Sequence, residues 1–356
     1  MRSFDYSKLA DVTWDNEIIS YISKIHEYKG KQGLFLRQKP LELERLTEIA
    51  KIQSTESSNR IEGIITTQSR LKQLVEDKTT PRNRDEEEIL GYRNVLNLLH
   101  ESYDVIPVKS SYILQMHREL LKYTNYSYGG RFKTAPNEID MILPSGEKTV
   151  LFKPLEPFET PDAVNAICDN YQNLLNKELV DELILIPCFI LDFLCIHPFN
   201  DGNGRMSRLL TLLLLYRSGY LVGQYISIEK AIADTKEAYY DALRRSDAGW
   251  HTGENDPKPF IKYMLGVILA CYREFEERIS IVEKAGAKST AYDIVKTYAI
   301  KKIGKFSKRE VLSACPSLGS SSVEAALKKL VEDGTLVRVG AGRNTLYVRS
   351  DSQNDC

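Results

Sequence analysis

Two apolar runs near the middle of the chain limit the folds that it can adopt. Leu183–Ile196 is apolar apart from Asp192, and Leu209–Leu215 is apolar apart from Thr211. Each run is too short to cross a bilayer, but it has the length and composition of a helix buried on all sides. Pro198 must end the first helix, because proline lacks an amide hydrogen. The sequence therefore predicts a mainly α fold with two adjacent core helices joined by a short loop.

That loop concentrates polar side chains and glycines within twelve residues. It has the sequence His197-Pro198-Phe199-Asn200-Asp201-Gly202-Asn203-Gly204-Arg205-Met206-Ser207-Arg208. Gly202 and Gly204 allow close approach of a ligand to the backbone. The free amides at the start of the second helix form a site for an anion.

The side chains of the loop suit a nucleoside triphosphate. Arg205 and Arg208 lie at i and i+3, so they share a helix face and can bind phosphate oxygens. Asp201 offers the oxygen ligand that Mg²⁺ prefers, and His197 can accept a proton near neutral pH. A plain glycine-rich turn with solvated arginines is the alternative. Neither of the two common nucleotide motifs, GxxxxGK[ST] and GxGxxG, occurs in the chain.

The order and spacing of these twelve residues resemble the HPFx(D/E)GNGRxxR signature of the Fic family. The resemblance implies transfer of AMP from ATP, with Mg²⁺, to a Tyr, Thr or Ser hydroxyl of a protein, which can be the chain itself. It implies that His197 is the catalytic base and Asp201 the metal ligand. It assigns nucleotide binding to Gly202, Asn203, Gly204, Arg205, Met206, Ser207 and Arg208.

A second motif lies about 135 residues upstream. Ser58-Asn59-Arg60-Ile61-Glu62-Gly63 resembles the (S/T)xxxE(G/N) inhibitory motif of the same family. Ser58 and Glu62 share a helix face, and Gly63 can end that helix. The resemblance implies that Glu62 pairs with Arg208 and holds ATP in an unreactive pose. An ordinary surface glutamate, or a residue that activates water to remove AMP, are the alternatives.

Two further regions resemble parts of the family. β-prone segments flank a Pro/Gly turn and predict a hairpin, which in the family is a flap that pairs with the target. The target-binding residues would be Ile139, Met141, Ile142 and Leu143. Tyr239 and Tyr240 resemble a tyrosine pair near the adenine. A plain surface hairpin and a pair of core aromatics are the alternatives.

The C-terminal segment has a different charge balance from the rest of the chain. Residues 285–350 hold 12 Lys and Arg against 5 Asp and Glu, a net +7, whereas the whole chain carries −1. A helix starting at Phe306, a second over Ser320–Gly334 and two strands predict a winged helix-turn-helix. DNA binding would use Lys328, Lys329, Arg338 and Arg343, although three serines and Glu324 open the second helix. A protein-docking or dimerising module is the alternative.

We expect three domains: a helical region with the inhibitory helix (1–100), a Fic-like catalytic core with a trailing helix (101–284) and the winged helix-turn-helix (285–350). The charged stretch Asp77–Glu88 is expected to be a solvated linker, and His117 a packed helical residue. Six cysteines without a CxxC pair, and no signal-like or membrane-spanning segment, favour a cytoplasmic enzyme. A homodimer is one option for its oligomeric state, which the sequence leaves open. The other functions to weigh are de-AMPylation, transfer of another phosphate-containing group, and a nucleotide-sensing DNA-binding regulator.

Overall fold

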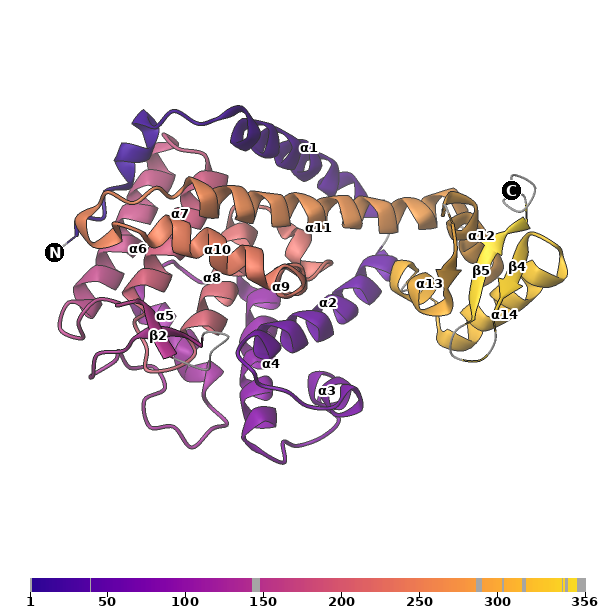
Figure 1. Ribbon diagram of the computed structural model, residues 1–356, viewed down its shortest axis with the longest axis horizontal. Helices are drawn as coiled ribbons and strands as arrows, with labels where there is room; N and C mark the ends of the chain where they lie inside the picture. The colour runs from indigo at the N-terminus through magenta and orange to yellow at the C-terminus, as the bar shows by residue number, and fades with distance from the viewer. Residues whose placement is uncertain are drawn as a thin grey trace. The chain divides into compact units, whose positions relative to one another are not determined.

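The computed structural model describes residues 2–38, 40–142, 148–285, 290–302, 304–315, 318–340, 342 and 345–350. It is mainly helical and divides into two compact units (Figure 1). Unit 1 comprises Met1–Gln32 and Ala50–Cys271, and unit 2 comprises Gly33–Ile49 and Tyr272–Cys356. The sequence border expected at residue 100 falls within helix α4 (Arg84–Ser102), and the one at 284 falls at the end of α11 (Lys258–Ala285). The division into three domains stays a prediction.

Unit 1 is built around helices α7 (Glu182–Ile196) and α8 (Asn203–Arg217), which pack against each other. Both predicted core helices are therefore confirmed. Phe189, Phe193 and Leu209 are fully buried, and each such side chain contributes about 1.5–3 kcal/mol through removal from water. The surrounding elements are η1 (Tyr6–Asp11), α1 (Asn16–Gln38), α2 (Pro40–Ile61), α3 (Gln68–Val75), α4, α5 (Ser110–Leu120), α6 (Thr160–Lys177), η2 (Leu221–Gln224), α9 (Ile228–Asp234), α10 (Lys236–Asp247), η3 (Trp250–Thr252) and α11.

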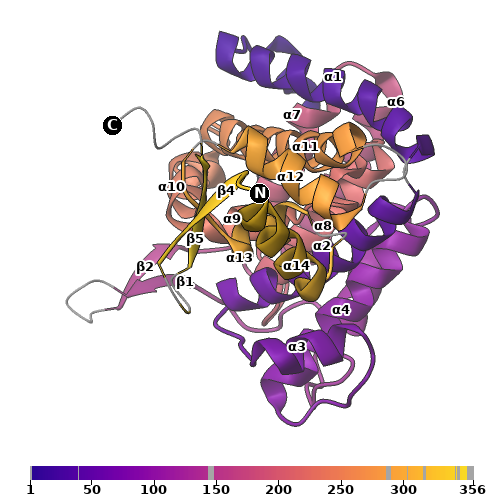
Figure 2. The same cartoon turned by 90° about the vertical axis from the view of Figure 1, so that its right-hand side faces the viewer.

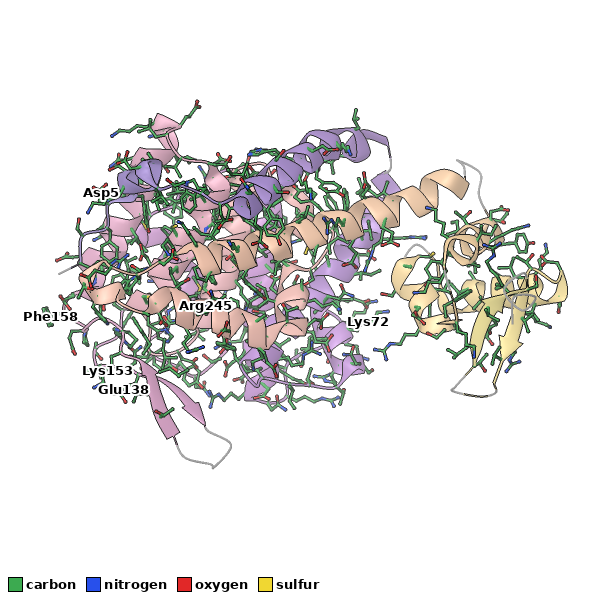
Figure 3. All side chains as sticks on the ribbon, turned by 45° about the horizontal axis from the view of Figure 1, so that its top comes forward. Asp5, Lys72, Glu138, Lys153, Phe158 and Arg245 are labelled. Atoms are coloured by element: carbon green, nitrogen blue, oxygen red, sulfur yellow. The ribbon has the colours of Figure 1, made fainter. Side chains whose placement is uncertain are left out.

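A two-stranded antiparallel hairpin projects from the helices of unit 1 (Figure 2). It consists of β1 (Ile139–Ile142) and β2 (Lys148–Phe152), with a register shift between Ile139 and Asp140. Glu138 and Lys153 lie 3.8 Å apart at its base (Figure 3). The expected hairpin is present, and its tip, including Leu143, lies outside the described residues.

The expectation that Asp77–Glu88 is a solvated linker is wrong in its second half. Helix α4 begins at Arg84, because the Asn83 side chain accepts a hydrogen bond from the amide of Glu86. Glu86 and Glu88 are buried, at 3% and 1% exposure. Glu86 pairs with Arg70 of α3 at 2.6 Å, so an ion pair allows this carboxylate to leave water.

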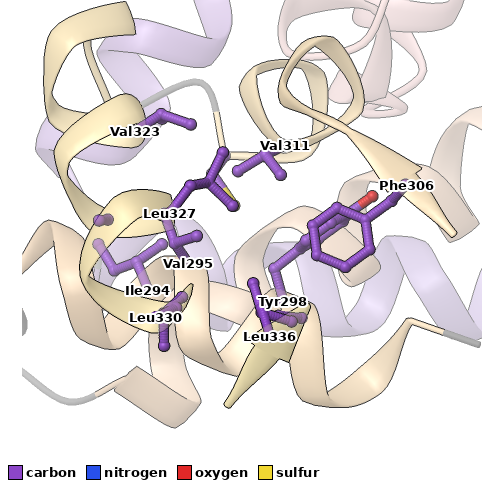
Figure 4. Close-up of a cluster of buried hydrophobic side chains, with 12 residues drawn as sticks. Ile294, Val295, Tyr298, Phe306, Val311, Val323, Leu327, Leu330 and Leu336 are labelled. Atoms are coloured by element: carbon purple, nitrogen blue, oxygen red, sulfur yellow. The ribbon is translucent and has the colours of Figure 1, made fainter. Parts of the chain in front are cut away.

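The C-terminal part of unit 2 contains α12 (Ala291–Lys301), β3 (Phe306–Ser307), α13 (Lys308–Ala314), α14 (Ser320–Glu332), β4 (Leu336–Val339) and β5 (Leu346–Arg349). The strands form one antiparallel sheet in the order β3-β5-β4. Phe306 opens as a strand, not as the expected helix start, because it pairs with Tyr347. The apolar faces of the helices meet the sheet in a closed core that includes Val295, Phe306, Val311, Leu327 and Leu336 (Figure 4).

None of the described helices is long and apolar enough to span a bilayer. The free cysteines of the described chain, Cys168, Cys188, Cys195, Cys271 and Cys315, are all buried.

Candidate active site

The loop between α7 and α8 turns through two left-handed residues. His197, the C-cap of α7, has φ 50°, and Gly202, the N-cap of α8, has φ 81°. A left-handed conformation is uncommon for a residue with a side chain, and it persists where the surroundings hold it. The loop therefore brings the imidazole of His197 and the free amides of α8 to one place.

Polar side chains brace this loop from inside. The side chain of Asn203 accepts a hydrogen bond from Phe199 N at Oδ1 (2.9 Å) and donates one from Nδ2 to Phe199 O (2.8 Å). Lys133 Nζ donates to Ile196 O (3.0 Å) and to Asn137 Oδ1 (2.8 Å). Asn137 Nδ2 in turn donates to Phe199 O at 3.0 Å. Asn203, expected to bind nucleotide, thus uses its side chain to close the loop.

His117 of α5 holds the other end of the loop. Its Nδ1 accepts a hydrogen bond from Gly130 N (3.1 Å), so Nε2 carries the proton and donates to Asp201 O (3.0 Å). The ring stacks on Phe199 with centroids 3.7 Å apart. Burial lowers the pKa of His117 to about 4, which keeps the ring neutral. It is a packed helical residue, as expected, and it also fixes the backbone of Asp201.

His197 is likewise held in its neutral form. Burial, with a smaller effect of the Lys133 charge, lowers the pKa of His197 to about 4. Its Nδ1 lies 3.3 Å from Leu194 O, a separation that suits donation to that carbonyl. In this tautomer Nε2 is the free acceptor, as a general base requires.

Asp201 is the half-exposed carboxylate of the site, with 41% of its side chain accessible. Its Oδ1 accepts a hydrogen bond from Gly202 N at 2.5 Å. Among the described residues, no three His, Cys, Asp or Glu side chains gather into a metal cluster. One carboxylate still fits Mg²⁺, which binds through one or two carboxylates together with waters and nucleotide phosphates.

Arg205 points into the protein and is only 1% exposed. Its Nη1 lies 2.6 Å from Glu88 Oε2, and its Nη2 lies 3.5 Å from Asp201 Oδ1. Glu88 also accepts a hydrogen bond from Arg84 Nε at 2.8 Å. The structure thus places Arg205 between two carboxylates, whereas the sequence had suggested a guanidinium open to phosphate.

Arg208 carries the pairing with Glu62 that the upstream motif implied. Its Nη2 donates to Glu62 Oε1 at 2.6 Å, and its Nε donates to Ser58 Oγ at 2.8 Å. Burial acts to raise the pKa of Glu62, but the charge of Arg208 and its hydrogen bond to the carboxylate, with the charge of Arg205, outweigh burial and lower that pKa. The Glu62 side chain keeps 33% of its surface exposed.

The end of α2 sets the position of Glu62. Helix α2 stops at Ile61, and Gly63 takes a left-handed φ of 80° while its amide donates to Arg60 O. Glu62 therefore leaves the helix in a turn and lies over the start of α8. A methyl group at Gly204 would overlap its carboxylate, so the two residues are in close contact.

A buried polar network fixes α2 against the rest of unit 1. Ser54 Oγ donates to Glu229 Oε2 at 2.7 Å, and Tyr92 OH donates to Glu229 Oε1 at 2.9 Å. Lys236 Nζ donates to Ile61 O at 3.0 Å. Glu229 is 1% exposed, and burial raises its pKa. Sequence reasoning gave Glu229 no role of its own, because its partners Ser54 and Tyr92 lie far away along the chain.

The remaining predicted residues differ in accessibility. Met206 is fully buried and Ser207 is 1% exposed, with Oγ donating to Gly204 O at 2.7 Å. Tyr239 is buried and Tyr240 is 42% exposed, with their rings edge to face at 5.3 Å. Burial raises the pKa of both tyrosine hydroxyls, and the charges of Glu62 and Arg208 also act on these pKa values. The tyrosine pair therefore lies near the site.

The structure describes three of the four residues expected to bind the target through the hairpin. Ile139 is half-buried, and Met141 and Ile142 pair with Thr149 and Lys148 in the hairpin. On the facing strand, Val150 and Leu151 are exposed.

Comparison with known proteins points to one family. Residues 107–215 match the model of the Fic/DOC family. The chain is 26% identical over 232 residues to "Protein adenylyltransferase Fic" of Culex quinquefasciatus, and 25% identical to the protein of the same name from Aedes aegypti. Each alignment covers 62% of this chain but 41% of the relative, so the chain spans about two fifths of the length of these relatives.

Solved structures share the fold. A Fic family protein from Desulfovibrio desulfuricans G20 aligns over 95% of this chain and 97% of its own, with a TM-score of 0.59 and 20% identity. A Fic-domain-containing signalling protein from Bacteroides thetaiotaomicron covers 70% of this chain and 95% of its own, with the same TM-score and 25% identity. Together with the loop geometry, the match of residues 107–215 to the Fic/DOC family model supports a Fic domain in this chain.

Proposed function

We propose that this chain transfers AMP from ATP to a hydroxyl group of a protein. The observation that carries the proposal is a neutral His197 at the end of α7, four residues before Asp201, with the free amides of α8 and its Arg208 at the other end of the same loop. The name of the curated relatives, protein adenylyltransferase, supports the same reaction.

The α8 amides, Asp201 and His197 have different roles in the proposed reaction. The first amides of α8 would bind the anionic phosphates, and Asp201 would hold Mg²⁺, which neutralises charge on the phosphate oxygens when bound. Nε2 of His197 accepts the proton of the target hydroxyl. The oxygen then bonds to the α-phosphorus while the bond to the bridging oxygen breaks, and pyrophosphate leaves. Positioning and charge neutralisation supply most of the rate in such transfers.

We further propose that Glu62 keeps this activity low. Its carboxylate forms an ion pair with the Arg208 guanidinium at 2.6 Å. The terminal phosphate of ATP would need the same positive charge. The hairpin would hold the target by adding a strand beside β1 or β2, a mode that the exposed Val150 and Leu151 suit. A glutamate that is one third exposed could also activate water, so removal of AMP is the second outcome to test.

The test compares labels in a chain with Glu62→Gly. ATP labelled on the α-phosphate should label protein, and ATP labelled on the γ-phosphate should not. Adding His197→Ala should reduce the rate by about 10²–10⁴-fold, the usual contribution of a general base. Undiminished α-label in the double variant would overturn the assignment of His197. Release of AMP from labelled protein by the wild-type chain, but not by Glu62→Gly, would indicate the hydrolytic alternative.

We also propose that the C-terminal part of unit 2 binds duplex DNA. A groove of about 720 Å³ there is lined by Lys308, Arg309, Lys328 and Arg338, together with Glu324 and Glu332. Lys329 instead lies over the ring of Tyr292, and Arg343 lies outside the described residues. Binding to a random-sequence duplex should weaken steeply with salt, and Lys328→Ala with Arg338→Ala should flatten that dependence. Salt-independent binding, or none, would favour a protein-docking module.

A further inference from the structure

One carboxylate outside the motif lies against the catalytic loop and has no role in the proposed reaction. Glu88, in the second turn of α4, is as buried as the core leucines, at 1% exposure. Its two oxygens face two arginines: Oε1 accepts from Arg84 Nε at 2.8 Å, and Oε2 lies 2.6 Å from Arg205 Nη1. A buried carboxylate is stable only with such partners.

The guanidinium of Arg205 has two carboxylates within reach, at unequal distances. Glu88 is at 2.6 Å and Asp201 is at 3.5 Å. Among the described residues, Nε and Nη1 of Arg205 and Oε2 of Glu88 have no partner in hydrogen-bond geometry. Arg205 is therefore held toward Glu88 by charge rather than by directional bonds. Such a side chain can move to another carboxylate when the first one loses its charge.

Movement of Arg205 would affect the metal ligand directly. Asp201 is 41% exposed, and its cationic neighbour Arg205 lies nearer to Glu88 than to Asp201. If Glu88 were uncharged, Asp201 would be the nearest carboxylate left for a guanidinium buried at 1% exposure. An Arg–carboxylate pair at short distance would then compete with a metal ion for the same oxygens.

We propose that Glu88 is a positioning residue that draws Arg205 toward itself, limits the contact between Arg205 and Asp201 to the longer distance of 3.5 Å, and so keeps Asp201 free to bind Mg²⁺ with the nucleotide. The proposal rests on the proposed function for the identity of the ligand, Mg²⁺ with ATP. It assigns Arg205 to the organisation of the loop, and it leaves Arg208 and the amides of α8 to contact phosphate.

The chain offers a matched control on the same helix. Glu86 is 3% exposed and pairs with Arg70 at 2.6 Å, so it is a buried, arginine-paired carboxylate like Glu88. Its other partners are Thr66 and the amide of Arg82, which lie between α2 and α4 and not in the catalytic loop. Glu86→Gln removes the same charge from the same helix without acting on Arg205.

The experiment uses the 356-residue chain with Glu62→Gly. Titration calorimetry measures how ATP binding depends on Mg²⁺, at a series of Mg²⁺ concentrations and in EDTA. Glu88→Gln should raise the Mg²⁺ concentration for half-maximal ATP affinity about tenfold or more, as for other residues that orient a metal ligand. ATP binding in EDTA should change less than about twofold, since the phosphate contacts remain. Glu86→Gln should leave both quantities unchanged.

A second variant separates competition from a general structural role. Arg205→Met added to Glu88→Gln removes the competing cation and should return the Mg²⁺ requirement toward that of the parent. Glu88→Asp, which keeps the charge, should show a smaller shift and serves if Glu88→Gln does not fold. An unchanged Mg²⁺ requirement in folded Glu88→Gln, or no recovery in the double variant, would overturn the proposal. Absence of α-label transfer by the parent would contradict the proposed function instead, because these binding measurements do not require turnover.

Discussion

Helix α8 carries two arginine–glutamate pairs that have the same length and different surroundings. Arg205–Glu88 and Arg208–Glu62 both measure 2.6 Å. Glu88 sits within α4 and is 1% exposed, whereas Glu62 sits in the turn after α2 and is 33% exposed. A carboxylate that keeps contact with water loses little when it separates from its partner, but a fully buried one has nothing to replace the pair. The comparison indicates a permanent pair and a removable one on the same helix.

Stability should separate the two pairs most strongly. Glu88→Ala removes a fully buried carboxylate that pairs with both Arg84 and Arg205, so it should lower the free energy of unfolding by about 3–5 kcal/mol. Glu62→Ala removes a partly screened pair, and Ser58 still holds Arg208, so the loss should be about 1 kcal/mol. Urea denaturation followed by tryptophan fluorescence reports on unit 1, which contains both tryptophans, Trp14 and Trp250. Equal losses in the two variants would remove the distinction.

A smaller effect, on the rate of label transfer, should follow from weakening the Arg208–Glu62 pair without changing either of its residues. Ser58→Ala deletes the hydrogen bond to Arg208 Nε and should weaken the hold on Glu62 by about 1–2 kcal/mol, raising α-label transfer by roughly tenfold at most. Ser57→Ala is the control, since Ser57 is equally buried on α2 and has no described bond to Arg208. The result to watch for is a rise that Ser57→Ala shares, because it would point to loosening of the helix as a whole.

The smallest effect concerns pH. The pKa of His197 is lowered to about 4 from about 6.5, so the imidazole is already unprotonated throughout the neutral range. The pKa of Glu62 is also lowered, so its pairing is complete above its ordinary value and is lost only as the pH falls through the lowered one. For chain with Glu62→Gly, kcat/KM should vary less than about twofold between pH 6.5 and 8. An acid limb centred near pH 6.5 would show that His197 titrates as an ordinary histidine.

The sequence predicted the parts of the site whose signals are local. Apolar runs and Pro198 defined α7 and α8, and the motif residues placed His197 and Asp201 on the loop between them. The spacing of Ser58 and Glu62, with the family resemblance, anticipated the contact with Arg208.

The residues that were missed act through contacts far along the chain. Glu88 looked like part of a solvated charged stretch, and its partner Arg205 lies 117 positions later in the printed sequence. The Asn83 cap with Glu86 three residues on was the available signal that a helix begins there. Lys133, Asn137 and Glu229 gave no comparable signal, because a polar residue reveals its burial only when its partners are known.

The most direct test of the removable pair is α-label incorporation by the wild-type chain and by Glu62→Gly, at equal concentration and saturating Mg²⁺ and ATP. Since each 1.4 kcal/mol of lost pairing corresponds to a factor of ten, incorporation by Glu62→Gly should exceed that of the wild type by about tenfold or more. Equal incorporation by the two proteins would contradict the account, because Arg208 would then be no more available to ATP without Glu62 than with it.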